Sequence, residues 1–315
     1  MPKAKRNALQ IHQMTIGDFE RLFQNEDACK QYLTNNRWSD GIIRCPRCGF
    51  DSVHEHSGKP FHWNCYQCSP GGVGYRFSVL VGTIFENTNK PLRDWFRVMH
   101  MMLTSKKGIS ALQIYRVMGF GSYNTALLMC NKIRVALGNI EFKQLVGVVE
   151  VDETFVGGKA KNKHKDKRGY RNGTGGGGPR GGIGSGKAVL VGAVQRKGNV
   201  VAKMVSGIDG DSLLGFIRET VSDRVSLICT DAWRSYRSLG KEFPHGVVDH
   251  RKGEYVVGAV HTNTIEGFWS MVKRGIVGTF HKVSHKYLPL YVNEFEFRYN
   301  NRKNPDIFGA AIRAC

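Results

Sequence analysis

The chain has 315 residues, of which 41% are hydrophobic and 23% are charged, and this composition excludes a disordered or a fibrous protein. Its 46 Lys and Arg residues outnumber its 26 Asp and Glu residues, and the formal charge of +20 indicates a polyanionic partner, with nucleic acid as the first choice. Because the sequence has neither a run of about 18 apolar residues nor a secretory signal, we expect no membrane partner, reduced thiols, and a cytoplasmic location at the bacterial nucleoid, or a nuclear one in a eukaryote.

The first predicted element is a helix near the amino terminus. Apolar residues recur at helical spacing from Ile16 to Leu33, and Thr15 can act as the N-cap. We therefore assign residues 1–38 to an N-terminal helical segment.

Two pairs of closely spaced cysteines follow, in a segment rich in turn residues and aromatics. Cys45 and Cys48 form the first pair, and Cys65 and Cys68 form the second, with sixteen residues between the pairs. Two such pairs deliver four thiolates to one tetrahedral zinc ion, whereas redox chemistry would not predict two of them. The sequence predicts a zinc ribbon over residues 39–88, with one structural Zn²⁺ that performs no chemistry.

A pair of amphipathic helices is predicted next, within residues 89–142. Ser110 and Gly119 suit the two ends of the first helix, and the second follows a Gly-Phe-Gly-Ser turn. The pair is typical of a helix-turn-helix DNA-binding domain, in which Lys132 and Arg134 would contact DNA. The alternative is a packing motif with no role in DNA binding.

From Leu145 onward, β-branched apolar runs alternate with helical ones, which predicts a mixed α/β domain over residues 143–315. The expected elements are strands Leu145–Asp152, Ala188–Val194, Val200–Val205 and Ser226–Asp231, and a helix Ser212–Thr220. An insertion over residues 157–187 is rich in Gly, Lys and Arg, so we expect a basic loop that does not pack. Its Arg168 and Arg171 can contact DNA, and a solvated insertion without a partner is the alternative.

Acidic residues close two of these apolar strands. Asp152 ends the first strand and Asp231 ends the last. A carboxylate at the end of a buried strand costs free energy unless a cation meets it, and two strands of one sheet can bring both acids to a shared edge. The alternatives are that Asp231 only caps the following helix, and that Glu150 or Glu153 takes the place of Asp152.

A helix around residues 263–276 supplies the third acid. Its apolar residues Ile265, Phe268, Trp269, Val272 and Ile276 form one stripe, and Asn263, Glu266, Ser270 and Lys273 share another face. We choose Glu266 as the third metal ligand, with Lys273 and Arg274 as contacts to a DNA backbone. Two alternatives stay open: Asn263 and Glu266 can form a capping box, and Asn263 can share the role of Glu266.

The order of these motifs resembles a known family. The segments VEVDET at 149–154, TDAW at 230–233, HTNTIEGFW at 261–269 and FRYN at 297–300 look like those of the zinc-ribbon insertion-sequence transposases of bacteria, which are relatives of the eukaryotic Merlin elements. The resemblance covers nearly the whole chain from the zinc ribbon onward. It implies an RNase H-like catalytic domain, a DDE triad of Asp152, Asp231 and Glu266, and recognition of terminal inverted repeats.

The reaction that the resemblance implies is DNA phosphoryl transfer assisted by two divalent ions per active site. Mg²⁺, or Mn²⁺, is expected because the ligands are all oxygens, and Asp152 would bridge both ions while Asp231 and Glu266 hold one each. The expected partner is double-stranded DNA, which includes the terminal inverted repeats of the element and the target DNA. The chain is also expected to form a homo-oligomer that is at least a dimer. The alternatives are a transposase-derived DNA-binding protein without catalysis and a nuclease of the same fold.

Overall fold

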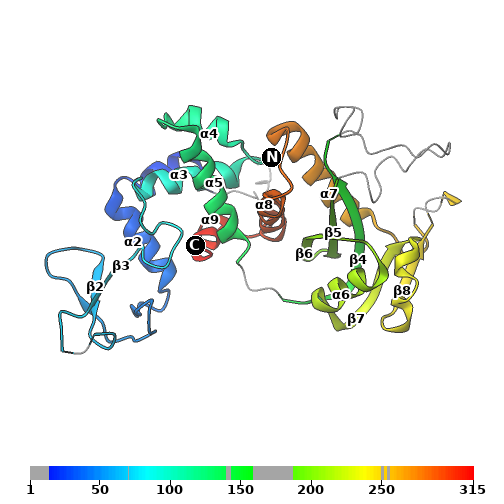
Figure 1. Cartoon of the computed structure of the whole chain (residues 1–315), viewed down its shortest axis with the longest axis horizontal. Coiled ribbons are helices and arrows are strands. Elements are labelled where there is room, and N and C mark those ends of the chain that lie inside the picture. The colour runs from blue at the N-terminus through cyan, green and yellow to red at the C-terminus, as the bar shows by residue number, and fades with distance from the viewer. Residues whose placement is uncertain (1–13, 70, 140–142, 159–186, 250–251, 254–255) are drawn as a thin grey trace, which may run out of the picture. The chain divides into compact units, whose positions relative to one another are not determined.

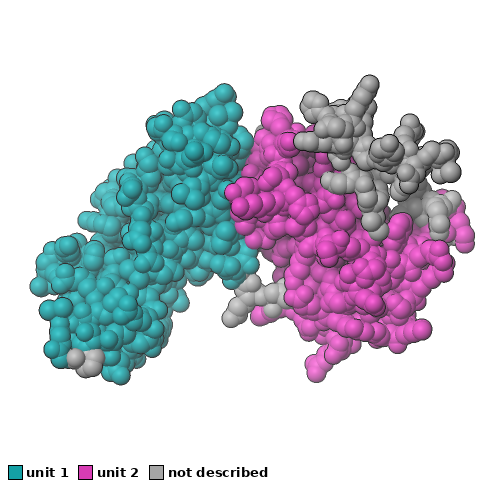
Figure 2. Space-filling view, viewed as in Figure 1, with its two compact units in different colours: residues 1–140, 301–315 teal, residues 141–300 magenta. Residues whose placement is uncertain are grey.

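The computed structural model of the chain describes residues 14–69, 71–139, 143–158, 187–249, 252–253 and 256–315 (Figure 1). It divides into two compact units, which are unit 1, with residues 1–140 and 301–315, and unit 2, with residues 141–300 (Figure 2). Arg168 and Arg171, which the sequence analysis predicts as DNA contacts, lie outside the described residues. No helix among the described residues is both long and apolar enough to cross a membrane.

Unit 1 has a helical body and a small sheet. The helices are α1 (Ile16–Leu22), α2 (Glu26–Arg37), α3 (Leu92–Thr104), α4 (Ala111–Met118), α5 (Tyr123–Leu137) and α9 (Ile307–Arg313). Phe23 is fully buried in this body, and its ring centroid lies 5.0 Å from that of Phe96 and 5.5 Å from that of Phe308. Phe308 lies on α9, so the C-terminal residues pack with α2 and α3, whereas the sequence analysis assigned them to the catalytic domain.

The single amino-terminal helix predicted from Ile16 to Leu33 is wrong, because the chain forms α1 and α2 there. Thr15 is the N-cap of α1, as predicted. The break has a local cause: Asn25 adopts an extended conformation and its side-chain oxygen accepts a hydrogen bond from the Ala28 amide at 2.9 Å. A capping asparagine starts a new helix at that point.

The small sheet of unit 1 lies in the predicted zinc-ribbon segment. Its three antiparallel strands are β1 (His54–Glu55), β2 (His62–Cys65) and β3 (Tyr75–Ser78), in the order β1-β2-β3. Trp63 and Phe77 are buried partners across β2 and β3. Short strands with so small an apolar core need a further source of stability, such as a structural metal.

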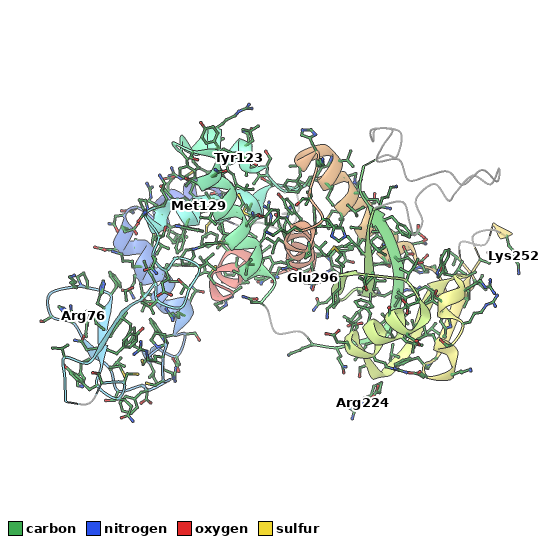
Figure 3. All side chains as sticks on the ribbon, in the orientation of Figure 1. Arg76, Tyr123, Met129, Arg224, Lys252 and Glu296 are labelled. Atoms are coloured by element: carbon green, nitrogen blue, oxygen red, sulfur yellow. The ribbon has the colours of Figure 1, made fainter. Side chains whose placement is uncertain are left out.

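The predicted helix pair is present as α4 and α5. Ser110 caps α4 by accepting a hydrogen bond from the Gln113 amide, and Gly119 ends it in the left-handed region at φ 63°. Ser122 caps α5, and the exposed Tyr123 opens that helix (Figure 3). Whether the pair reads DNA stays a prediction.

The basic residues of α5 are directed into unit 1 by the packing of α5 against α3 and α4. Arg134 is fully buried, which contradicts its prediction as a DNA contact, because a groove contact requires an exposed guanidinium. Lys132 is half-buried, and its ammonium donates to the Ile84 carbonyl at 3.3 Å. The spacing of polar residues along α5 therefore does not reveal whether Lys132 and Arg134 face solvent or form contacts within the protein.

Unit 2 is built on a mixed sheet, as predicted, but the sheet has five strands, one more than the four expected from the sequence. Its strands are β4 (Leu145–Val156), β5 (Ala188–Gln195), β6 (Val200–Val205), β7 (Val221–Asp231) and β8 (His245–Val248). The order is β6-β5-β4-β7-β8, with antiparallel pairing of β4 to β5 and of β5 to β6, and parallel pairing of β4 to β7 and of β7 to β8. Two short 3₁₀ turns, η3 (Arg234–Tyr236) and η4 (Leu239–Lys241), connect β7 to β8.

Helices cover both faces of this sheet (Figure 1). Helix α6 (Gly210–Thr220) packs on one face, while α7 (Asn263–Gly275) and α8 (Leu288–Asn300) pack on the other, with the π-helical turn η6 (Ile276–Phe280) between them. Glu296 of α8, labelled in Figure 3, accepts a hydrogen bond from the Ala202 amide at 3.1 Å. Asn300 accepts another from the Val200 amide at 2.7 Å, so α8 satisfies backbone donors of the edge strand β6.

A close approach of α7 to the sheet depends on Gly192 of β5. A Cβ atom at this position would lie 2.6 Å from the ring of Trp269 on α7, too close for any side chain without a shift. The same glycine pairs with Asp152 across β4 and β5. Gly192 thus lets α7 lie close to the sheet beside Asp152.

Candidate metal centres and active site

The four paired cysteines converge as the sequence analysis predicts. Their sulfur atoms all lie within 4.8 Å of one another, with 3.8 Å between the sulfurs of Cys45 and Cys68 and 3.6 Å between those of Cys48 and Cys65. Four sulfurs placed tetrahedrally around zinc, each about 2.3 Å from it, would be roughly 3.8 Å apart. The cluster therefore has the dimensions of a closed four-thiolate zinc site.

Local backbone geometry prepares this cluster for metal binding. Gly49 follows the first pair at φ 76°, in the left-handed region that glycine favours, and its amide donates to the Cys45 carbonyl. A hydrogen bond from the backbone of Phe50, together with bonds from the other thiols, lowers the pKa of Cys48 to about 7. A lowered pKa favours the thiolate at Cys48, which is the form that binds zinc. Burial raises the pKa of Cys65, and the hydrogen bond with Cys48 raises the pKa of Cys68 to about 12, so the lowered pKa is a property of Cys48 and not of the whole cluster.

Asp152 and Asp231 come from neighbouring parallel strands. The last paired residues of β4 and β7 are Glu150 and Cys229, so each aspartate lies two residues further along its strand. Strand β4 does not end at Asp152, as the sequence analysis expected, but continues to Val156 because it stays paired with β5. Both aspartates are partly buried.

The negative charges of the carboxylates around Asp152 repel one another. Burial is the main cause that raises the pKa of Asp152 to about 8, and the carboxylates of Glu153, Asp231 and Glu266 raise it further. The predicted trio of acids is therefore close enough for each of the other two to act on Asp152. Such an arrangement of carboxylates is stabilised by divalent cations.

Glu266 lies in the first turn of α7, with its side chain exposed. Its carboxylate accepts a hydrogen bond from the Thr262 hydroxyl at 2.9 Å. The capping box of Asn263 with Glu266 is absent, because the N-cap position is held by Thr262 and α7 has no side-chain cap bond from it. Among the described residues, the four cysteines are the one group whose possible ligand atoms all lie within 4.8 Å of one another. The carboxylate oxygens of Asp152, Asp231 and Glu266 do not form so tight a cluster.

Two other acids were alternatives to Asp152, and their contacts argue against both. Glu150 is fully buried, and its two carboxylate oxygens accept hydrogen bonds from Arg196, Thr264 and Ile265. Glu153 accepts a hydrogen bond from the buried Tyr236 hydroxyl at 2.7 Å. Protein donors therefore already bind both oxygens of Glu150 and one oxygen of Glu153.

Burial, opposed by the Tyr236 hydrogen bond, raises the pKa of Glu153 to about 7. The pKa of Tyr236 is raised as well, first by burial and then by the Glu153 charge. The structural roles of Tyr236 and Arg196 were not predicted, because they arise from contacts across the fold and not from a local spacing in the sequence.

Lys273 and Arg274 lie in the last turn of α7, and both are exposed. Arg274 also donates to the Ser270 carbonyl at 3.2 Å. Their cationic groups thus lie on the helix that carries Glu266, about two turns further along.

The raised pKa of Asp152 predicts an unusual dependence of stability on pH. Between about 3.8, its ordinary pKa, and about 8, the folded state binds the Asp152 proton more strongly than the unfolded state does. The free energy of unfolding should therefore fall as pH rises through this range. Without added divalent ions, Asp152→Asn should stabilise the protein at pH 8 by up to about a few kcal/mol and have much less effect at pH 5.

Urea unfolding followed by circular dichroism at both pH values checks this prediction. Asp209→Asn is the matched control, because hydrogen bonds from Ser212 lower the pKa of that exposed carboxyl, so no gain in stability is expected at pH 8. Equal effects of Asp152→Asn at the two pH values would contradict the electrostatic description of the site.

Comparison with known proteins identifies both parts of the chain. Residues 144–300 match the ISXO2-like transposase domain, and residues 24–70 match the transposase zinc-ribbon domain. The chain is 26% identical over 282 residues to an uncharacterized protein in transposable element ISH50 of Halobacterium salinarum, which covers 88% of this chain and 92% of that protein.

A second relative is an uncharacterized transposase-like protein of Haemophilus influenzae, 32% identical over 106 residues, which covers 33% of this chain and 84% of that protein. One chain in the cryo-EM structure of a simian T-cell lymphotropic virus intasome with a PP2A regulatory subunit shares 15% identity, over 59% of this chain and 67% of that chain. Its TM-score of 0.29 is too low to establish a common fold. On the family matches and the two relatives, this chain belongs to the insertion-sequence transposases that combine a zinc ribbon with an ISXO2-like transposase domain.

Proposed function

We propose that the chain is a DDE transposase that binds the terminal inverted repeats of its mobile element and catalyses metal-dependent DNA cleavage and strand transfer. The observation that carries the proposal is the placement of Asp152 and Asp231 on the paired strands β4 and β7 and of Glu266 on a helix that packs against β4, so that the charges of Asp231 and Glu266 both raise the pKa of Asp152. The mixed sheet with helices on both faces is consistent with an RNase H-like catalytic unit.

The donor set fits a hard divalent cation. Asp152, Asp231 and Glu266 would hold Mg²⁺ or Mn²⁺, because they offer only carboxylate oxygens. The ions would supply activation of the attacking water or hydroxyl and stabilisation of the leaving oxygen. The two aspartates stand on paired strands, which fixes their positions, and the partial burial of Asp152 strengthens the electrostatic interactions of the site. The cysteine cluster would hold one structural Zn²⁺.

Double-stranded DNA is the proposed partner, at the element ends and at the target. The zinc ribbon and the α4–α5 pair would contribute to recognition of the ends, and Lys273 and Arg274 would contact the backbone beside Glu266. Joining two ends suggests that at least two copies of the chain act together. The formal charge of +20 favours a polyanionic partner of this kind.

Lys273→Ala should weaken DNA binding without changing its sequence preference. A lost phosphate contact reduces the slope of log K against log salt by about 1. Lys203→Ala is the control, because Lys203 is an exposed lysine of β6 whose ammonium lies 2.5 Å from the Glu219 carboxylate. Fluorescence anisotropy with labelled element ends at several salt concentrations measures both variants, and equal slopes for wild type and Lys273→Ala would remove Lys273 from the interface.

The experiment that tests the function uses labelled DNA taken from the sequences that flank the gene. We expect cleavage at the element ends and joining to a target DNA, both dependent on Mg²⁺ or Mn²⁺. Binding without cleavage in any divalent ion would favour the DNA-binding alternative. Cleavage without joining would favour the nuclease.

A further inference from the structure

We propose that Glu150 and Arg196 are positioning residues that fix the first turn of α7 against the sheet and so set the place of Glu266 relative to Asp152 and Asp231. The inference rests on the proposed function, since it assigns these residues to the support of the same three carboxylates. Neither Glu150 nor Arg196 would touch DNA or a metal ion.

The carboxylate of Glu150 acts as the N-terminal cap of α7 from a distant part of the sequence. Its Oε2 accepts hydrogen bonds from the backbone amides of Thr264 at 2.7 Å and Ile265 at 3.1 Å. The Thr264 hydroxyl donates to Oε1 at 2.8 Å. The first amides of a helix lack partners within the helix, and an anion is favoured there by the helix dipole. This contact replaces the side-chain cap that Thr262 does not supply.

Arg196 stabilises this buried charge and also holds the segment that leads into α7. It follows β5, and its Nε donates to Glu150 Oε1 at 2.7 Å. Its two terminal nitrogens donate to the carbonyls of Ala259 at 2.6 Å and His261 at 3.0 Å. The His261 ring nitrogen Nδ1 lies 3.2 Å from Glu150 Oε1. A single guanidinium thus ties the chain before α7 to the strand that carries Glu150.

The contact between Glu150 and the first turn of α7 lies on the same two elements, β4 and α7, that carry Asp152 and Glu266. Glu150 lies two residues before Asp152 and on the same face of β4, and Ile265 directly precedes Glu266 on α7. A shift of the first helical turn would therefore move Glu266 with little intervening backbone to absorb it. Full burial of Glu150 makes the contact stiff, because a buried carboxylate cannot exchange its donors for water.

Glu150→Gln tests the inference with little change in shape. Glutamine keeps one oxygen for the α7 amides but places an amide group opposite Arg196. Amide hydrogen exchange should accelerate at residues 263–266, and the Mn²⁺ concentration for half-maximal binding should rise by roughly 10- to 100-fold, the usual effect of removing a residue that orients a metal ligand. Strand transfer per folded molecule should fall by a similar factor and recover in part at high Mn²⁺.

Glu242→Gln is the matched control, because it makes the same change in another Arg–Glu pair of unit 2. Arg218 binds the Glu242 carboxylate at 2.9 and 2.6 Å, and this exposed pair has no bond to α7. It should change neither the exchange of α7 nor Mn²⁺ binding. If Glu150→Gln does not fold, Arg196→Lys keeps the charge but loses the contacts to both carbonyls, and it should produce the same effects to a smaller degree.

The readouts separate failure of this inference from failure of the proposed function. Unchanged exchange at residues 263–266 in Glu150→Gln, with unchanged Mn²⁺ affinity, would overturn the positioning role even if the wild type is an active transposase. If Glu150→Gln only loses stability, and its folded fraction binds Mn²⁺ with normal affinity, then Glu150 and Arg196 form a structural contact only. This result would also overturn the positioning role. A wild type that neither cleaves nor joins DNA would refute the proposed function, while faster exchange in the variant would still support the anchoring of α7.

Discussion

Replacement of Asp152 by asparagine should abolish both cleavage and strand transfer while DNA binding persists. Asparagine is nearly isosteric, but it removes the negative charge that would attract divalent cations to this partly buried position. Loss of an essential catalytic group commonly lowers the rate by about 1,000-fold or more. Element ends should still be bound, because the proposed recognition residues lie in unit 1 and on the exposed face of α7.

Gel assays on labelled element ends, with Mg²⁺ and with Mn²⁺, measure the three activities together. Asp223→Asn is the matched control, since Asp223 is an exposed residue of β7, the strand that ends in Asp231, and no change is expected there. Cutting that survives Asp152→Asn would mean that the catalytic centre lies elsewhere. Loss of binding in the variant would mean that Asp152 supports DNA recognition and not only chemistry.

The zinc cluster and the sheet were predictable from local patterns. The spacing of Cys45, Cys48, Cys65 and Cys68 is a property of the sequence alone, and the structure brings the four sulfurs together. Strand Val200–Val205 has the predicted bounds, because turn-forming residues stand on both sides of it, with Gly198 before it and Gly207 after it. The mixed sheet follows from the alternation of strands and helices.

What could not be predicted depends on contacts across the fold. The continuation of β4 to Val156 is decided by pairing with β5, which comes after a long insertion. The direction of Arg134 is decided by packing against other helices, because helical period alone does not say which polar face is buried. The capping of α7 by Glu150 joins residues 114 positions apart, so no local signal identifies it.

The zinc ribbon should lose its fold when one thiolate is removed. Structural zinc contributes about 10–16 kcal/mol of apparent folding free energy in small zinc domains at neutral pH. The three short strands bury few large side chains, with Trp63 and Phe77 the main ones, so the ribbon has little else to hold it. Cys65→Ser should therefore release zinc and remove the hydrogen-exchange protection of residues 54–78, while the strands of unit 2 stay protected.

Cys315→Ser is the control for the chemical change, because the Cys315 thiol lies outside the cluster and donates to the Ala311 carbonyl, a bond that a hydroxyl can keep. It should bind one zinc ion per chain and protect the ribbon as the wild type does. Elemental analysis measures the zinc content, and hydrogen exchange followed by mass spectrometry measures the folding of the ribbon. A melting curve would not separate the loss of zinc from the unfolding of the ribbon. Protection of residues 54–78 in a zinc-free Cys65→Ser protein would show that packing alone folds the ribbon. Unfolding of unit 2 together with the ribbon would show instead that zinc supports the five-stranded sheet of unit 2, which none of the contacts of the four cysteines predicts.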